Sequence, residues 1–323
     1  MVNLVAAQKS LAHWLMKQAG VVPHTVEIEQ GTVMNFWVPT ETVKTQSKDK
    51  ASNIINNGGH NEGIKSKSKS AAKPVVDLVV LIHGFAAEGI VTWQFQVGSL
   101  TNKYSVYVPD LLFFGGSTSS RTDRSKAFQE ECVAKGLWKL GVKRCTVVGF
   151  SYGGMVAFEM AEKYPELVDA FVVSGSSIYN AVHTNLYNIG FNSLSEFLLP
   201  TSVEGVNKLF KVATYKNIWF PYRVYRDFLK VMFNNREEKA EFLDELEKQK
   251  GCTKHKFQQI HLLWGENDKI FLLDVAQRMK KRQLGEKVTL HGIKKAGHLV
   301  HVERPCAYNR CLKEFLATLT TED

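Results

Sequence analysis

A chain of 323 residues, 44% hydrophobic and 23% charged, has the ordinary composition of a globular protein and can bury a large core. Its formal net charge of +9 would suit a nucleic-acid partner, but residues 44–73 alone hold seven lysines against two acidic residues, a net of +5. The polar composition of this stretch predicts a mobile basic loop at about 44–73. No aromatic residue lies between its lysines to stack on bases, so we predict no nucleic-acid partner. Acidic lipid headgroups stay open as partners of this loop.

The number and spacing of the cysteines indicate the cellular compartment in which the protein works. They are five in number and scattered, and no pair has the C-x-x-C spacing. This pattern favours reduced thiols in the cytoplasm over a disulfide framework or a zinc site. No unbroken apolar run is long enough for a signal peptide or a membrane span. The five are Cys132, Cys145, Cys252, Cys306 and Cys311.

The first predicted element is an amphipathic helix within residues 1–20. Leu4, Leu11 and Leu15 share one face of it, and Lys9 and Lys17 lie elsewhere. We expect the helix to pack on its own domain. The alternative is peripheral contact with a membrane.

Alternating residues over 24–38, interrupted by Gln30-Gly31, predict an antiparallel hairpin. After the basic loop, "VVDLVVLIHGF" is a nearly continuous apolar run, which is typical of a strand buried on both faces of a parallel sheet. Further short apolar strands are expected at 104–110, 145–151, 169–176, 259–268 and 287–293, with helices at 125–140, 152–163 and 274–283. This alternation predicts an α/β fold with a mostly parallel sheet and helices on both faces.

Residues 178–254 interrupt the alternation with an aromatic-rich stretch that contains no convincing strand. It ends in "REEKAEFLDELEKQK", a charged amphipathic helix. We interpret this stretch as a helical insertion that covers the ends of the sheet. The predicted organisation is therefore a core at 1–177, a helical cap at 178–254 and the rest of the core at 255–323.

The candidate nucleophile is Ser151, in "GFSYGGM". By itself Gly-x-Ser-x-Gly is a weak signal, because glycine and serine are common residues. Here the serine falls where an apolar strand ends and a helix begins. A sharp turn at that junction exposes the serine side chain, and Gly149 and Gly153 leave room for the backbone.

A serine nucleophile needs a base, and the base needs an acid that orients it. Asp268 follows an apolar strand in "LLWGENDKI", and His298 follows the next one in "KKAGHLVHVERP". Functional groups of an open α/β sheet gather at such strand ends, so we expect the three to meet there. The rivals are Glu266 and Asp274 as the acid, and His291 and His301 as the base.

A tetrahedral intermediate also needs two donors for its oxyanion. The backbone N–H of Tyr152 follows the nucleophile, and the N–H of Phe85 lies in the loop that "HGF" begins. His83, beside Gly84 at a strand end, is interpreted as a residue that shapes this loop.

Together these pieces resemble the α/β-hydrolase superfamily, and within it the capped branch that contains monoacylglycerol-lipase-like serine hydrolases. The resembling segments occur in the family's order over about residues 24–320, apart from the basic loop. They are "LIHGF", "VYVPDLLFFGGS", "VVGFSYGGMVA", "LLWGENDKIF" and "AGHLVHVERP". The resemblance implies that Ser151, Asp268 and His298 form a catalytic triad. Phe113 departs from the family pattern, since it stands where a glycine is usual.

The predicted activity is hydrolysis of a carboxylic ester with an apolar acyl group, such as a monoacylglycerol, without metal or cofactor. The aromatic cap suggests that an apolar acyl group is bound beneath it. The aromatic residues assigned to the substrate are Phe113, Trp219, Phe220 and Tyr222. A serine nucleophile argues against epoxide hydrolases and haloalkane dehalogenases of this fold, which use aspartate. Carbon–carbon bond hydrolases, thioesterases and slow small-molecule receptors stay open, and the sequence assigns no oligomeric state.

Overall fold

The computed structural model of the chain describes residues 2–45, 77–178, 186–248, 257, 259–282 and 288–319. From residue 46 onward, the segment predicted as a mobile basic loop lies outside these ranges. Cys252 does as well.

The described strands form one sheet in the order β1-β2-β4-β3-β6-β7-β8-β9, with the short β5 beside β2. The β1–β2 hairpin joins β4 in antiparallel fashion, and from β4 to β9 every neighbouring pair is parallel. The strands are β1 (Val21–Glu29), β2 (Thr32–Pro39), β3 (Leu78–Ile82), β4 (Ser105–Pro109), β5 (Thr118–Ser119), β6 (Cys145–Phe150), β7 (Val168–Ser174), β8 (Gln259–Gly265) and β9 (Val288–Ile293). The predicted α/β class with a mostly parallel sheet is confirmed, and the order is that of an α/β-hydrolase fold.

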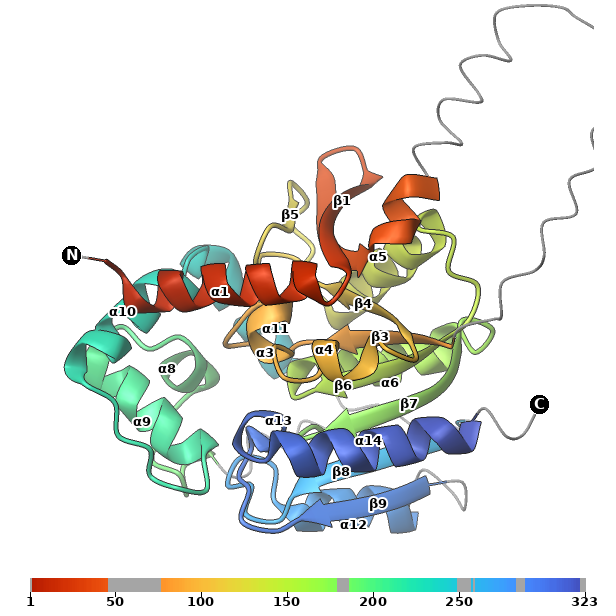
Figure 1. The fold of residues 1–323 in the computed structure, drawn as a ribbon. Coiled ribbons are helices and arrows are strands. Elements are labelled where there is room, and N and C mark those ends of the chain that lie inside the picture. The colour runs from red at the N-terminus through yellow and green to blue at the C-terminus, as the bar shows by residue number, and fades with distance from the viewer. Residues whose placement is uncertain are drawn as a thin grey trace, which may run out of the picture.

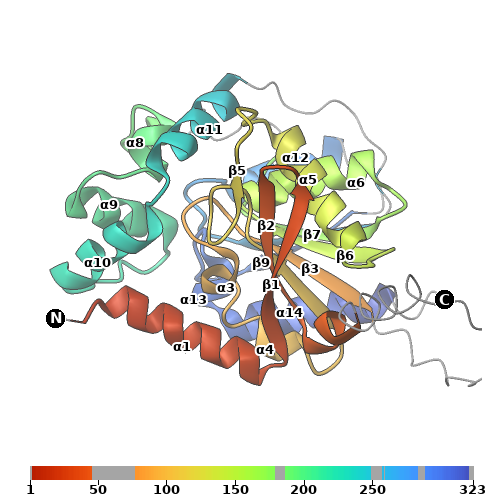
Figure 2. The same ribbon diagram turned by 90° about the horizontal axis from the view of Figure 1, so that it is seen from above.

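Helices cover both faces of this sheet, as predicted (Figure 1, Figure 2). On one face lie α1 (Leu4–Gln18), α3 (Gly89–Thr92), α4 (Val97–Leu100), α13 (Val300–Glu303) and α14 (Pro305–Leu319). On the other lie α5 (Lys126–Lys139), α6 (Tyr152–Lys163) and α12 (Leu273–Arg282). Successive residues of a strand point to opposite faces, so Val147 of β6 packs with the second group and Val148 with the first. This burial on both sides explains why all six residues of β6 are buried.

Helix α1 packs on its own domain, through Val5, Ala12 and Met16. The leucines that define its sequence amphipathicity, Leu4, Leu11 and Leu15, are on the exposed side instead. The helix therefore has two apolar faces, only one of which is buried. No helix in the described residues is both long and apolar enough to cross a membrane.

Four of the helices that the structure describes fall within the stretch predicted to be the cap. They are α8 (Leu194–Leu198), α9 (Val203–Ala213), α10 (Tyr222–Met232) and α11 (Arg236–Lys248). Figure 2 shows them grouped to one side of the sheet. The division of the chain at 178 and 254 stays a prediction, and residues 249–256 lie outside the described ranges.

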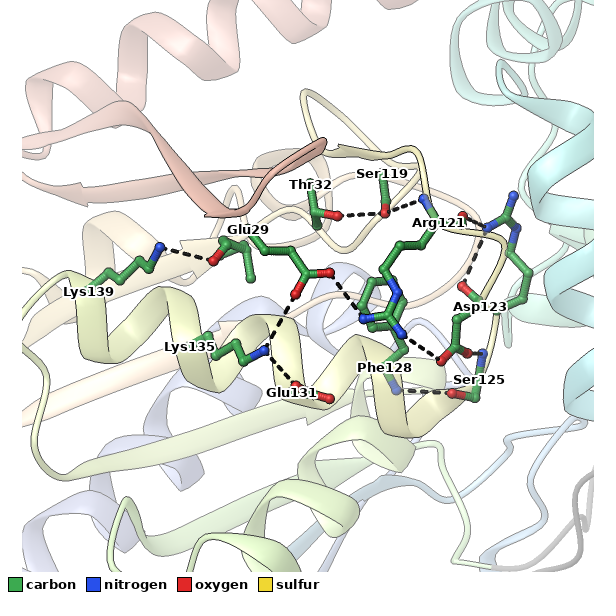
Figure 3. A network of polar contacts seen from close by, with 12 residues as sticks. Glu29, Thr32, Ser119, Arg121, Asp123, Ser125, Phe128, Glu131, Lys135 and Lys139 are labelled. Carbon is green, nitrogen blue, oxygen red and sulfur yellow. Dashed lines mark hydrogen bonds and ion pairs between the residues drawn. The ribbon is translucent and has the colours of Figure 1, made fainter.

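A polar network fastens the antiparallel edge of the sheet to α5 (Figure 3). Glu29 at the end of β1 contacts Arg121 at 3.1 Å and Lys135 of α5 at 3.7 Å. The Arg121 guanidinium holds the pKa of Glu29 below its ordinary value, and it also lies 4.5 Å from the centre of the Phe128 ring. Because Arg121 and Phe128 bracket the start of α5, this network fixes the segment that follows β5.

Candidate active site

Ser151 occupies a strained turn between β6 and α6. Its backbone has φ 53° and ψ −121°, a conformation that residues other than glycine rarely adopt. Its N–H donates to the carbonyl of Ser174 at 2.9 Å, which fastens the turn to the end of β7. A Cβ atom at Gly153 would lie 2.4 Å from the carbonyl oxygens of both Ile82 and His83, so only glycine fits there. The predicted sharp strand-to-helix turn is thus present.

Asp268 and His298 are joined in the structure. Oδ2 of Asp268 lies 2.9 Å from Nδ1 of His298, and both side chains are buried. Oδ1 of Asp268 accepts from the N–H groups of Ile270 at 2.8 Å and Phe271 at 3.0 Å. These two bonds hold the carboxylate in place, so its second oxygen orients the imidazole.

The rivals for these roles lie elsewhere. Glu266 is exposed, and Asp274 pairs with Arg278 at 3.0 Å on α12. His291 is exposed on β9. His301 is buried against Phe150, and burial lowers its pKa to about 3. Of the candidates, only Asp268 and His298 contact each other.

The imidazole of His298 lies beside the nucleophile turn. Its ring centroid is 4.8 Å from that of Phe150, the residue before Ser151. Within the described part of the chain, no hydrogen bond joins the Ser151 hydroxyl to Nε2 of His298. In free enzymes such bonds are commonly long and tighten when substrate binds.

The loop that carries His298 is braced by the end of α9. Leu299 donates its N–H to the carbonyl of Ala213 at 3.1 Å. The Glu303 carboxylate accepts from the N–H of Gly297 at 2.7 Å and from that of Tyr215 at 2.9 Å. The base is therefore held partly by the predicted cap, which the sequence did not indicate.

His83 orders the loop that would supply the second oxyanion donor. Its Nδ1 lies 2.7 Å from the Gly84 carbonyl oxygen, and its Nε2 accepts from the N–H of Leu111 at 2.9 Å. Burial lowers its pKa to about 4, so the ring is neutral near pH 7 and Nδ1 carries the proton. In a trans peptide the C=O and N–H point in opposite directions. His83 therefore holds the Gly84 carbonyl on one side and directs the N–H of Phe85 to the other.

Aromatic rings surround the two predicted oxyanion residues. The Phe85 ring packs edge-on against Phe114 at 5.2 Å and stacks on Phe242 at 5.8 Å. Phe242 also meets the Tyr152 ring edge-on at 4.6 Å. We name Phe85, Phe114, Tyr152 and Phe242 the aromatic wall. Phe242 belongs to α11, the charged amphipathic helix predicted at the end of the cap stretch, and lies on its buried face.

Phe113 adopts the conformation for which the family pattern uses glycine, with φ 72°. Its neighbours hold it in this left-handed geometry. Arg124 lies 4.4 Å from the centre of its ring, and Asn235 donates to its carbonyl at 3.2 Å. Its side chain is buried, and its role in substrate binding stays a prediction.

Two of the aromatic residues assigned to the substrate do not face the core. Trp219 is 78% exposed and Tyr222 64% exposed, and their role in substrate binding stays a prediction. Both residues lie at the N-terminal end of α10, because Tyr222 is its first residue and Trp219 stands in the segment before it. Phe220 packs within the cap helices, edge-on to Tyr225 at 5.8 Å.

Gly175 offers a direct test of the acid–base pair. It follows β7 with φ 52°, and a Cβ there would lie 2.7 Å from Nδ1 of His298 and 3.1 Å from Oδ2 of Asp268. We expect Gly175→Ala to displace the imidazole and lower kcat for a soluble ester by roughly 100-fold. Steady-state kinetics measures the change.

Gly141→Ala is the matched control. Gly141 also has a positive φ, 83°, but open space surrounds its Cβ position. Both variants should lose about 1 kcal/mol of stability from backbone strain, while only Gly175→Ala loses activity. Equal activity in the two variants would contradict the placement of His298.

The sequence is similar to known hydrolases. Residues 77–211 match the model of the alpha/beta hydrolase fold family. A 2-hydroxy-6-oxononadienedioate/2-hydroxy-6-oxononatrienedioate hydrolase from a Pseudomonas species is 27% identical over 257 residues, which cover 75% of this chain and 88% of that protein. Epoxide hydrolase 3 of Xenopus tropicalis is 30% identical over 110 residues, 33% of this chain and 29% of that protein.

Solved structures share the fold at low sequence identity. A bacterial membrane phospholipase A superposes with a TM-score of 0.74 at 19% identity, over 98% of this chain and 91% of the other. The 2-hydroxy-6-oxo-6-phenylhexa-2,4-dienoate hydrolase of a Rhodococcus strain superposes with a TM-score of 0.70 at 18% identity. The superposition covers 92% of this chain and 99% of that protein. The family-model match and these structures show the α/β-hydrolase fold. The monoacylglycerol-lipase-like branch has no such support, because the relatives include carbon–carbon bond hydrolases.

Proposed function

We propose that this chain, which has the α/β-hydrolase fold, is a serine hydrolase that cleaves carboxylic esters with an apolar acyl group. The observation that carries the proposal is the buried hydrogen bond between Asp268 and His298, beside the strained turn that presents Ser151. Strain of this kind is costly, and it is common at nucleophile turns because it exposes the hydroxyl.

The chemistry follows from these positions. Ser151 Oγ attacks the ester carbonyl while Nε2 of His298 takes its proton, and Asp268 stabilises the imidazolium. The N–H groups of Phe85 and Tyr152 bind the oxyanion, and Tyr152 begins α6, where the first N–H groups of a helix have no intrahelical acceptor. The imidazolium then protonates the leaving alcohol, and water hydrolyses the acyl-serine by the same steps.

The apolar acyl group is inferred from the aromatic wall. Two of its rings belong to the residues that carry the oxyanion donors, Phe85 and Tyr152, and the other two pack against them. The acyl group of a bound ester would lie next to these residues. Such a lining favours an alkyl or aryl group over a charged one.

A second candidate is hydrolysis of a carbon–carbon bond in an acidic substrate. The Pseudomonas relative is named as a hydrolase of a 2-hydroxy-6-oxo dienedioate. Lys239 of α11 favours this second candidate. Its ammonium is buried and lies 4.6 Å from the centre of the Phe114 ring. It donates to the Met232 carbonyl at 3.2 Å and to Oδ1 of Asn234 at 3.1 Å, and in the described ranges it pairs with no acidic side chain. Burial lowers the pKa of Lys239 to about 8, and a substrate carboxylate would favour its charged form.

A substrate panel tests the proposal. We expect p-nitrophenyl esters and monoacylglycerols of medium chain length to give the highest kcat/KM, above short-chain esters, acyl thioesters and a 2-hydroxy-6-oxo dienoate. Preference for the dienoate, lost in Lys239→Met but kept in the exposed control Lys248→Met, would favour the second candidate. No turnover of any compound would contradict both.

A further inference from the structure

Helix α1 exposes an apolar stripe from Leu4 to Leu15. Leu4, Leu11, Trp14 and Leu15 are 43%, 55%, 56% and 45% exposed, and at 100° per residue they lie on one side of the helix. The buried residues Val5, Ala12 and Met16 lie on roughly the opposite side. Nothing in the described residues covers the exposed face.

Helix α10, which contacts the N-terminal end of α1, and the loop before it also expose aromatic side chains. The loop exposes Trp219, and α10 begins with the exposed Tyr222. The two helices are fastened at their N-terminal ends, since the N–H of Leu4 donates to Oδ2 of Asp227 at 2.9 Å and Arg223 donates to the Val2 carbonyl. Figures 1 and 2 both show α1 beside α10. We name Leu4, Leu11, Trp14, Leu15, Trp219 and Tyr222 the α1–α10 surface.

The charges on the two segments that carry this surface are mostly positive, although Lys9 of α1 pairs with Glu88 at 2.7 Å. Residues 2–20 and 214–232 contain six lysines and arginines and a single acidic residue, Asp227. Asp227 is buried and paired with Arg226 at 3.1 Å. Lys17, Lys216 and Lys230 are exposed. A second copy of the chain would bring an equal positive charge against this face, whereas an anionic surface would complement it.

We infer that the α1–α10 surface docks on a membrane that contains anionic lipids. Leucine and tryptophan side chains of a helix lying in the interface enter the acyl boundary, while tryptophan and tyrosine favour the headgroup level. The lysines remain at the headgroups and add attraction to anionic lipids. Since α10 belongs to the helices over the predicted active site, docking would hold that site next to lipid. This inference concerns binding and stands without the proposed reaction.

Vesicle co-sedimentation of the full chain tests it. The wild type should bind vesicles of phosphatidylcholine mixed with phosphatidylserine, and bind less to phosphatidylcholine alone or at high salt. The triple variant Leu11→Gln, Trp14→Gln, Leu15→Gln should lose about tenfold or more of this binding. Lys17→Gln with Lys216→Gln should reduce only the difference between the two vesicle types.

Trp138→Gln is the matched control, because Trp138 is a 41% exposed aromatic residue on α5. It should bind vesicles as the wild type does, and circular dichroism melting should show all variants folded. A wild type that binds neither vesicle overturns the inference. Light scattering gives a second test. A wild type that forms dimers and binds no vesicles, with a triple variant that is monomeric, also overturns the inference, because a second copy of the chain would then cover the surface.

Discussion

Replacing Ser151 by alanine should lower kcat for a p-nitrophenyl ester by roughly 10⁴-fold or more. The variant keeps the oxyanion donors, the aromatic wall and the Asp268–His298 pair, so KM should change little. Only the atom that attacks the carbonyl is lost. Alanine also tolerates the backbone of residue 151, φ 53°, no worse than serine, so the fold should be retained. Steady-state kinetics and a thermal melt measure both properties.

Ser119→Ala is the control for this variant. Ser119 lies on β5, where its hydroxyl pairs with Thr32 at 2.8 Å, on the antiparallel edge of the sheet. Its activity should equal that of the wild type. Substantial turnover by Ser151→Ala would show that another residue is the nucleophile, or that water attacks the substrate directly.

Replacing Asp268 by asparagine should cost about 10⁴-fold in kcat at neutral pH. An asparagine oxygen can still accept from the N–H groups of Ile270 and Phe271, so the loop should remain folded. Its amide then faces Nδ1 of His298, and two donors cannot share a hydrogen bond unless the imidazole takes the tautomer with its proton on Nε2. That tautomer cannot accept the proton of Ser151.

Glu266→Gln and Asp274→Asn are the matched controls, since both carboxylates follow the same strand and neither contacts His298. Each should retain wild-type rates. If Asp268→Asn turned over at the wild-type rate while Glu266→Gln did not, the orienting acid would be Glu266.

Much of the site could be predicted because its residues mark strand ends. Ser151 follows β6, Asp268 follows β8 and His298 follows β9, and parallel strands bring these ends to one edge. The unusual Phe113 was also visible in the sequence, because it replaces a glycine at a position that proves to have positive φ.

Other features depend on packing between distant segments, which periodicity does not reveal. The sequence of α1 shows two apolar stripes, and only the structure shows that Met16 faces the core while Leu11 does not. The exposure of Trp219 depends on where α10 begins. The contact between Phe242 and Phe85 joins residues far apart in the chain, and nothing local indicates it.

The central claim is that Ser151 is an activated nucleophile. The most direct measurement is reaction of the intact chain with a fluorophosphonate probe, followed by mass spectrometry of the peptides. We predict one modified residue, Ser151, no labelling of Ser151→Ala, and much slower labelling of Asp268→Asn, in which the imidazole is misdirected. A wild type that stays unlabelled, or that is labelled at another serine, would contradict the claim.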